Sequence, residues 1–185
     1  MATFIALVVL FSWGPALAQW SGHTSSKLQP AARGGPANLT GVEAAIVNLT
    51  NDIRRRHGLA MLLEDGVCRD AARGHSADML NRNYFSHFDP RGLTVRERLP
   101  ADLAARKWGE NIWTGRGYDP RQIRKLAEKI MDSWMRSAGH RENILNPGYT
   151  HLGVGVMAKN QEIKATQVFI GMAEGGRPGS SFQRK

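Results

Sequence analysis

The chain of 185 residues contains one cysteine, Cys68, so it cannot form an intrachain disulfide. This excludes a disulfide-stapled scaffold, which is the common solution for small exported domains. The chain is long enough to bury a core of its own, and that core has to hold the fold. Because Cys68 lies among apolar residues at the start of a helical pattern, we expect a buried, unreactive thiol.

The apolar run at residues 4–13 is too short to span a bilayer. It is followed by Ala16-Leu17-Ala18, an A-x-A cleavage motif, so residues 1–18 are predicted to be a secretory signal peptide. The protein is therefore expected to be secreted or periplasmic. No Lys or Arg precedes the run, which leaves an uncleaved anchor open as the alternative.

Acidic residues are scarce: 16 Asp and Glu stand against 25 Lys and Arg, for a formal net charge of +9. Such a balance favours an acidic partner, for example a cell-envelope surface. The basic residues are scattered and lack the interleaved aromatic residues that stack bases, so no nucleic-acid partner is expected. A solvated surface on an exported monomer explains the same composition more simply.

The composition divides the chain into four segments. Residues 1–18 are the predicted signal peptide, residues 19–40 a flexible linker, residues 41–174 the folded domain and residues 175–185 a disordered basic tail. Helical spacing predicts helices at 41–57, 66–83 and 95–99, a long helix that Asp119 caps, and a short helix at 141–145. Alternation predicts strands at 108–114, 151–158 and 163–172, the last two joined as a hairpin. Helices and strands in this order indicate an α+β layered domain.

Two histidines and a carboxylate stand beside turn or strand signals. His87 follows an aromatic pair in a loop, and Glu110 follows a glycine on a predicted strand. His140 is placed at the end of a helix, where the helix dipole would favour the protonated imidazole. These donors suit a divalent metal, zinc above all, but their spacing matches no short metal motif. Metal binding, ligand binding and purely structural roles therefore stay open at this stage.

Other polar residues give weaker signals. His75 lies on the inward stripe of its helix, so we expect a core histidine bonded to backbone, whereas His151 opens a strand and is expected to face solvent. Ser86 and Ser137 lie near histidines, but no G-x-S-x-G elbow marks either as an activated nucleophile. Gly74, inside the second predicted helix, is interpreted as a point of close packing against a neighbour.

Five short motifs follow one another along the chain. They are F-S-H at 85–87, G-E-N at 109–111, W-M-R-S-A-G-H-R-E-N-I-L-N-P at 134–147, L-G-V-G-V at 152–156 and T-Q-V-F at 166–169. In this order they resemble the CAP superfamily of cysteine-rich secretory, antigen 5 and pathogenesis-related 1 proteins, also called SCP-like, and most of all its bacterial, cysteine-poor branch. The resemblance covers residues 42–172. It implies a three-layer α-β-α sandwich.

Many members of that family form a central cavity from two histidines and two glutamates. The resemblance assigns His87 and His140 to the histidines, which would be the metal ligands, and Glu110 to one glutamate. The other glutamate falls near Ser137, which is not acidic. Three residues are expected to support the cavity walls: Asn111, Ser137 and Asn143. The cofactor implied, if there is one, is zinc or another divalent cation.

Two classes of function survive. We favour a non-catalytic exported binding module whose cleft at His87, Glu110 and His140 receives a small ligand, a lipid or a divalent metal ion, because no nucleophile–base pair or complete ligand set is visible. The resemblance implies lipid and sterol binding, defence or toxin roles, without a common reaction. The alternative is a metal-dependent, peptidase-like hydrolase with Glu110 as general base. A third reading makes the basic surface a binder of acidic polymer or membrane.

Overall fold

The computed structural model describes residues 39–103 and 105–172. The predicted signal peptide, nearly all of the predicted linker and the predicted tail lie outside the described residues. The chain divides into a unit at Met1–Gly35 and a unit at Pro36–Lys185, and the described residues belong to the second. They form five helices and four strands: α1 (Thr40–Arg56), β1 (Leu63–Glu64), α2 (Gly66–Asn81), α3 (Val95–Arg98), β2 (Ala105–Arg116), α4 (Ile123–Arg136), α5 (Ala138–Leu145), β3 (His151–Lys159) and β4 (Glu162–Met172).

The strands form one sheet in the order β1-β3-β4-β2. β3 and β4 are the predicted hairpin, and Asn160 and Gln161 turn it with φ of 50° and 65°, the left-handed conformation that a tight hairpin turn requires. β4 also pairs with β2 in antiparallel fashion, whereas β1 is a two-residue strand parallel to β3 that the sequence did not predict. β2 therefore lies at one edge of the sheet.

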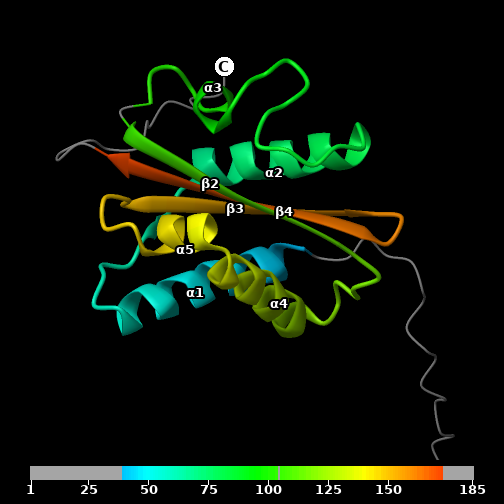
Figure 1. Cartoon of the computed structure of the whole chain (residues 1–185), viewed down its shortest axis with the longest axis horizontal. Helices are drawn as coiled ribbons and strands as arrows, with labels where there is room; N and C mark the ends of the chain where they lie inside the picture. The colour runs from blue at the N-terminus through cyan, green and yellow to red at the C-terminus, as the bar shows by residue number, and fades with distance from the viewer. Residues whose placement is uncertain (1–38, 104, 173–185) are drawn as a thin grey trace, which may run out of the picture. The chain divides into compact units, whose positions relative to one another are not determined.

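Helices cover both faces of the sheet (Figure 1). α2 lies on one face, with α3 beyond it near β2, and α1, α4 and α5 lie on the other. This is the α-β-α sandwich of an α+β domain, as the sequence predicts. Among the described helices, none has the length and apolar character needed to cross a bilayer.

β3 shows why the two faces differ. Its Leu152, Val154 and Val156 pack into the larger apolar core, together with residues of α1 and α4. Gly153 and Gly155 alternate with them and lie against α2, because a Cβ on Gly155 would stand 2.1 Å from the backbone nitrogen of Arg73. The L-G-V-G-V motif thus combines an apolar face with a face that a helix backbone contacts directly.

Several local expectations meet the structure differently. Cys68 is fully buried, and burial raises the pKa of its thiol, as expected of an unreactive cysteine. The prediction that His151 faces solvent is wrong, because its exposed fraction is 8%. The prediction that Gly74 packs closely against a neighbour is also wrong, since nothing lies within 4 Å of a Cβ placed there.

The expected cap of the long helix is wrong as well. α4 begins at Ile123 with Gln122 at its N-cap. The Asp119 carboxylate instead accepts a hydrogen bond from the backbone N–H of Arg121 at 3.0 Å, which closes a local turn before the helix starts. Aspartate has both options at such a position, and the local turn prevails here.

Candidate functional site

The candidate site lies around β2, which carries Glu110 between Gly109 and Asn111. The Glu110 side chain is only 4% exposed. Gly109 precedes it, and a Cβ there would stand 2.2 Å from the hydroxyl oxygen of Tyr149. The glycine of the G-E-N motif is therefore needed so that Tyr149 can lie against the strand.

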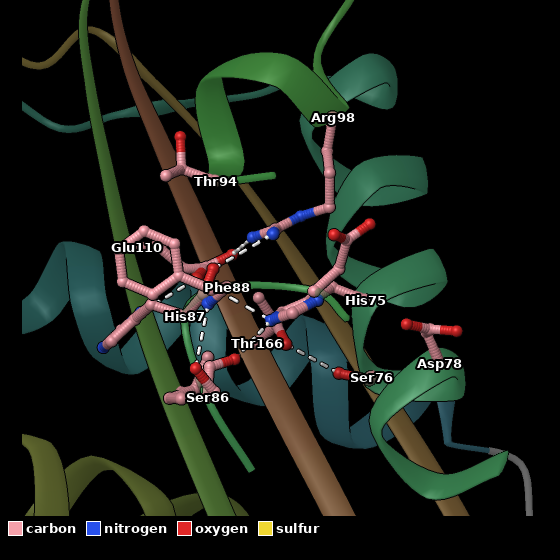
Figure 2. A network of polar contacts seen from close by, with 12 residues as sticks. His75, Ser76, Asp78, Ser86, His87, Phe88, Thr94, Arg98, Glu110 and Thr166 are labelled. Atoms are coloured by element: carbon pink, nitrogen blue, oxygen red, sulfur yellow. Dashed lines mark hydrogen bonds and ion pairs between the residues drawn. The ribbon is translucent and has the colours of Figure 1, made fainter. Parts of the chain in front are cut away.

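Both carboxylate oxygens of Glu110 are engaged by donors (Figure 2). Oε1 accepts a hydrogen bond from Nδ1 of His87 at 2.9 Å, and Oε2 accepts one from Nη2 of Arg98. The Nε2 atom of His75 lies 3.9 Å from Oε1. Glu110 is thus the centre of a network that joins β2, the 84–93 loop, α2 and α3.

His87 combines a fixed orientation with exposure. Its side chain is 47% exposed, although Nδ1 is held by Glu110. An ionised carboxylate only accepts hydrogen bonds, so Nδ1 carries the hydrogen and a neutral ring keeps Nε2 as its acceptor. The network therefore orients an imidazole without burying it.

His140 lies beside His87, with 6.3 Å between the ring centroids and 54° between the ring planes. The expectation that it ends a helix is wrong. α5 begins at Ala138, so His140 belongs to its first turn, where the dipole favours the neutral ring. Burial, and then the neighbouring His87, lower the pKa of His140 from its ordinary value. The expected protonated form is therefore replaced by a neutral one.

Two amides fasten the strand to α5. Asn111 Nδ2 donates to the carbonyl oxygen of His140 at 3.1 Å, and Asn143 Nδ2 donates to that of Glu110 at 3.2 Å. Asn143 Nδ2 also donates to Asn111 Oδ1 at 2.9 Å. Ser137 stands between α4 and α5, and its side chain makes no N-cap hydrogen bond. The backbones that carry Glu110 and His140 are thus linked by Asn111 and Asn143.

The stretch at 134–149, which contains the motif at 134–147, also covers the edge of the sheet. Three side chains from this stretch donate to alternate carbonyl oxygens of β2: Trp134 Nε1 to Ile112 at 3.0 Å, Asn143 Nδ2 to Glu110 at 3.2 Å and Tyr149 hydroxyl to Trp108 at 3.1 Å. A bare edge strand invites pairing with other chains, and side-chain donors remove that option. The spacing of Trp134, Asn143 and Tyr149 therefore also serves to cover the edge of the sheet.

His75 behaves as the expected core histidine. It is buried, and its Nε2 donates to the carbonyl oxygen of Ser86 at 3.0 Å. Burial is the main reason that its pKa is lowered. It thereby holds the loop that carries His87 against α2.

Arg98 is the residue of the network that sequence reasoning missed. Its side chain is 11% exposed, and its Nη1 donates to the carbonyl oxygens of His87 at 3.1 Å and Leu93 at 2.9 Å. The capping box of Thr94 and Glu97 predicts a helix start, which places Arg98 at the end of α3. No local pattern indicates that the guanidinium reaches a strand carboxylate.

A cavity of about 550 Å³ adjoins the network on its α2 side. It shares His75 and Arg98 with the network, and its lining does not include His87, Glu110 or His140. Its lining residues come from α2 and from the 91–100 segment: Val67, Asp70, Ala71, Gly74, His75, Arg91, Glu97, Arg98 and Pro100. This cavity is therefore distinct from the half-open face where the two histidines meet.

The donors do not fit a divalent metal as they are arranged. Within residues 39–103 and 105–172, no group of three or more His, Cys, Asp or Glu side chains is placed to hold a metal ion. The oxygens of Glu110 already accept from His87 and Arg98, and the position of the second glutamate, near Ser137, is not acidic.

The sequence belongs to a known family. The model of the CAP family, described as "Cysteine-rich secretory protein family", matches residues 47–170, and the chain is a member of it. This agrees with the resemblance carried by the five motifs.

Two relatives from Bacillus subtilis (strain 168) are similar over part of their length. The uncharacterized protein YkwD is 34% identical over 161 residues, which are 86% of this chain and 56% of YkwD. The uncharacterized membrane protein YlbC is 40% identical over 118 residues, 63% of this chain and 32% of YlbC. The chain thus spans about half of one relative and a third of the other.

Solved structures agree with the fold. An extracellular SCP-domain protein from Bacillus anthracis str. Ames has a TM-score of 0.58 and 39% identity, covering 71% of this chain and 40% of that protein. An outer surface protein of Borrelia burgdorferi has a TM-score of 0.66 at 14% identity, covering 76% of this chain and 99% of that protein. The second likeness concerns the fold alone.

Proposed function

We propose that this CAP-domain protein is an exported, non-catalytic binding module, and that its ligand contacts the face where His87 and His140 meet. The similar protein of Bacillus anthracis is described as extracellular, which agrees with the predicted signal peptide. The proposed ligand is a small molecule or a lipid. A fold shared with a family transfers no reaction, so the proposal rests on the site.

The observation that carries the proposal is the pair of His87 and Glu110. A side chain that is 47% exposed is ordinarily free to change rotamer, yet His87 is held by a 2.9 Å hydrogen bond to a buried carboxylate. Preorganised polar groups of this kind reduce the ordering cost of binding. Phe85 and Phe88 lie within two residues of His87 in the chain and are 48% and 57% exposed, so the loop that carries the oriented ring also exposes apolar side chains.

The same geometry weighs against hydrolysis. A general base has to reach the proton it removes, whereas the Glu110 side chain is 4% exposed and its two oxygens are held by His87 and Arg98. Ser86 Oγ accepts from the backbone N–H of Phe88 at 3.0 Å, and its backbone oxygen, rather than its hydroxyl, contacts a histidine. Neither residue stands as an activated base or nucleophile.

The test is recovery of the bound molecule. Purified protein is incubated with a lipid and small-molecule extract of cell envelope, re-isolated, and analysed by native and denaturing mass spectrometry. We expect a discrete bound species with the wild type that is lost in His87→Ala and in His140→Ala. Arg121→Gln in the segment before α4 is the matched control, because this side chain is 75% exposed and, among the described residues, its hydrogen bonds are to Asp119.

Two outcomes contradict the proposal. A species retained by both histidine variants but removed by salt would indicate attraction to the basic surface instead. Hydrolysis of a peptide library by the wild type, abolished in a folded Glu110→Gln variant, would establish the enzyme reading.

A further inference from the structure

We propose that Arg98 is the permanent counter-cation of Glu110, and that its guanidinium keeps divalent metal ions out of the cluster of His87, Glu110 and His140. The inference does not depend on what the binding face receives. It concerns a residue outside the five motifs, and it explains why the metal expected from the resemblance does not fit this chain.

The contact between Arg98 and Glu110 is shielded from water. The two side chains are 11% and 4% exposed, and Nη2 of Arg98 is hydrogen-bonded to Oε2 of Glu110. Charges screened so little by solvent interact strongly, and removing a paired cation leaves a buried carboxylate without compensation. A metal approaching Glu110 has to displace this guanidinium or share the carboxylate with it.

The charge of the cluster gives a metal ion little electrostatic attraction. Glu110 carries one negative charge and Arg98 one positive charge, so this buried ion pair is neutral as a whole. The position near Ser137, to which the resemblance assigns the second glutamate, supplies no second carboxylate. Carboxylate and thiolate ligands add charge attraction to a divalent-metal site, and here Arg98 neutralises the carboxylate of Glu110.

The position of Arg98 is also fixed by its other contacts. Nη1 bridges the carbonyl oxygens of His87 and Leu93, so the guanidinium is tied to the loop that carries the histidine. The Nε atom of Arg98 is buried without a hydrogen-bond partner among the described residues. A buried donor left unpaired is costly, which indicates that the contacts of the two Nη atoms determine where the guanidinium sits.

Zinc titration of three proteins tests the proposal. The wild type, Arg98→Gln and Arg98→Lys are titrated with Zn²⁺ at pH 7.5 by calorimetry, and each is melted with and without Zn²⁺. We expect Arg98→Gln to bind Zn²⁺ at least about tenfold more tightly than the wild type and to melt higher in its presence. Arg98→Lys keeps the charge while losing the two-pronged geometry, so it should resemble the wild type in excluding zinc.

Two further variants locate the effect. His140→Ala in the Arg98→Gln background should abolish the gained affinity. Arg91→Gln is the matched control, since Arg91 pairs with Asp89 on the same loop and is 69% exposed. It should bind zinc no better than the wild type.

Several results would overturn the inference. Equal zinc affinity of the wild type and Arg98→Gln would do so, whether both bind or neither binds, and so would zinc binding by Arg98→Lys equal to that of Arg98→Gln. If Arg98→Gln fails to fold, the wild type and Arg98→Lys provide the test. The proposal is contradicted if either protein binds zinc and His140→Ala abolishes that binding. It is supported if neither protein binds zinc. Loss of the bound envelope molecule in the previous experiment bears on the binding function alone.

Discussion

Helices pack against the two faces of the sheet in different ways. On the face of α1, α4 and α5, large side chains from helices and strands interdigitate in the main apolar core. On the face of α2, the helix backbone lies directly on Gly153 and Gly155, and Ser76 donates to the carbonyl oxygen of Gly155 at 2.9 Å. The first face is held by the larger apolar core, whereas the second combines a smaller apolar cluster around Cys68, Ala72 and Ile170 with direct backbone contact and polar groups.

Buried polar groups form networks on both faces and at both edges of the sheet. Gln167 donates to Thr50 of α1 at 2.8 Å on one face, and Ser76 of α2 is hydrogen-bonded to Thr166 at 2.8 Å on the other. Glu43 of α1 accepts from Arg73 of α2 and from the backbone N–H of Val156 at 3.0 Å. Glu110 extends the same principle at the other edge of the sheet. The variants below separate the two faces, in order of decreasing expected effect.

Gly155→Ala tests the contact distance. Its new Cβ would stand 2.1 Å from the backbone nitrogen of Arg73, which cannot rotate away, so we expect a loss of about 4 kcal/mol in the free energy of unfolding, measured by urea denaturation. Gly74→Ala is the control on α2, the helix that Gly155 contacts. Nothing lies within 4 Å of a Cβ at Gly74, so Ala should stabilise the helix by about 0.5 kcal/mol. A mild effect of Gly155→Ala would mean that α2 does not rest on the strand backbone.

Leu152→Ala tests the opposite face at a neighbouring strand position. Leu152 is fully buried in the main apolar core. We expect a loss of about 3 kcal/mol through lost burial and a residual cavity. Leu152→Met, of similar volume, should lose well under half of that amount. If the two substitutions cost the same, packing volume does not govern this face.

Tyr149→Phe tests the cover on the edge of β2. It removes only the hydroxyl that donates to the carbonyl oxygen of Trp108 at 3.1 Å. We expect a loss of about 1 kcal/mol in the free energy of unfolding, because the carbonyl loses its partner. Hydrogen exchange should quicken in β2 and stay unchanged in β3. Uniform quickening across the sheet would show that the hydroxyl stabilises the whole fold instead.

The pH dependence should be the smallest effect. The pKa of His75 is lowered chiefly by burial, so the folded state binds fewer protons than the unfolded chain once the pH falls below about 6.5. The contribution of His75 is therefore complete above that pH and is lost as the pH falls through the folded pKa. His75→Gln keeps a donor for the carbonyl oxygen of Ser86 and does not titrate. Its stability should fall less than that of the wild type between pH 7.5 and pH 5.5; equal slopes would exclude His75 as the titrating group.

Much of the fold could be predicted from local pattern. α1, α2 and the β3–β4 hairpin follow from apolar spacing and from Asn160-Gln161, which are properties of neighbouring residues. The short β1 was missed because a two-residue strand has no period. The start of α4 and the first turn of α5 were misplaced because Asp119 and Gly139 allow more than one local structure.

The family motifs and the order of the longer helices and strands can be read from the sequence, because each is a contiguous stretch of chain. The grouping of His87, Glu110 and His140 as a candidate site follows from the family resemblance. Only the tertiary structure decided that the carboxylate of Glu110 is taken by Arg98, and that His140 opens a helix instead of ending one. The reason is physical: a guanidinium at the end of α3 reaches a carboxylate on β2 only after both have packed beside α2. No short-range pattern records the distance between two segments that folding brings together.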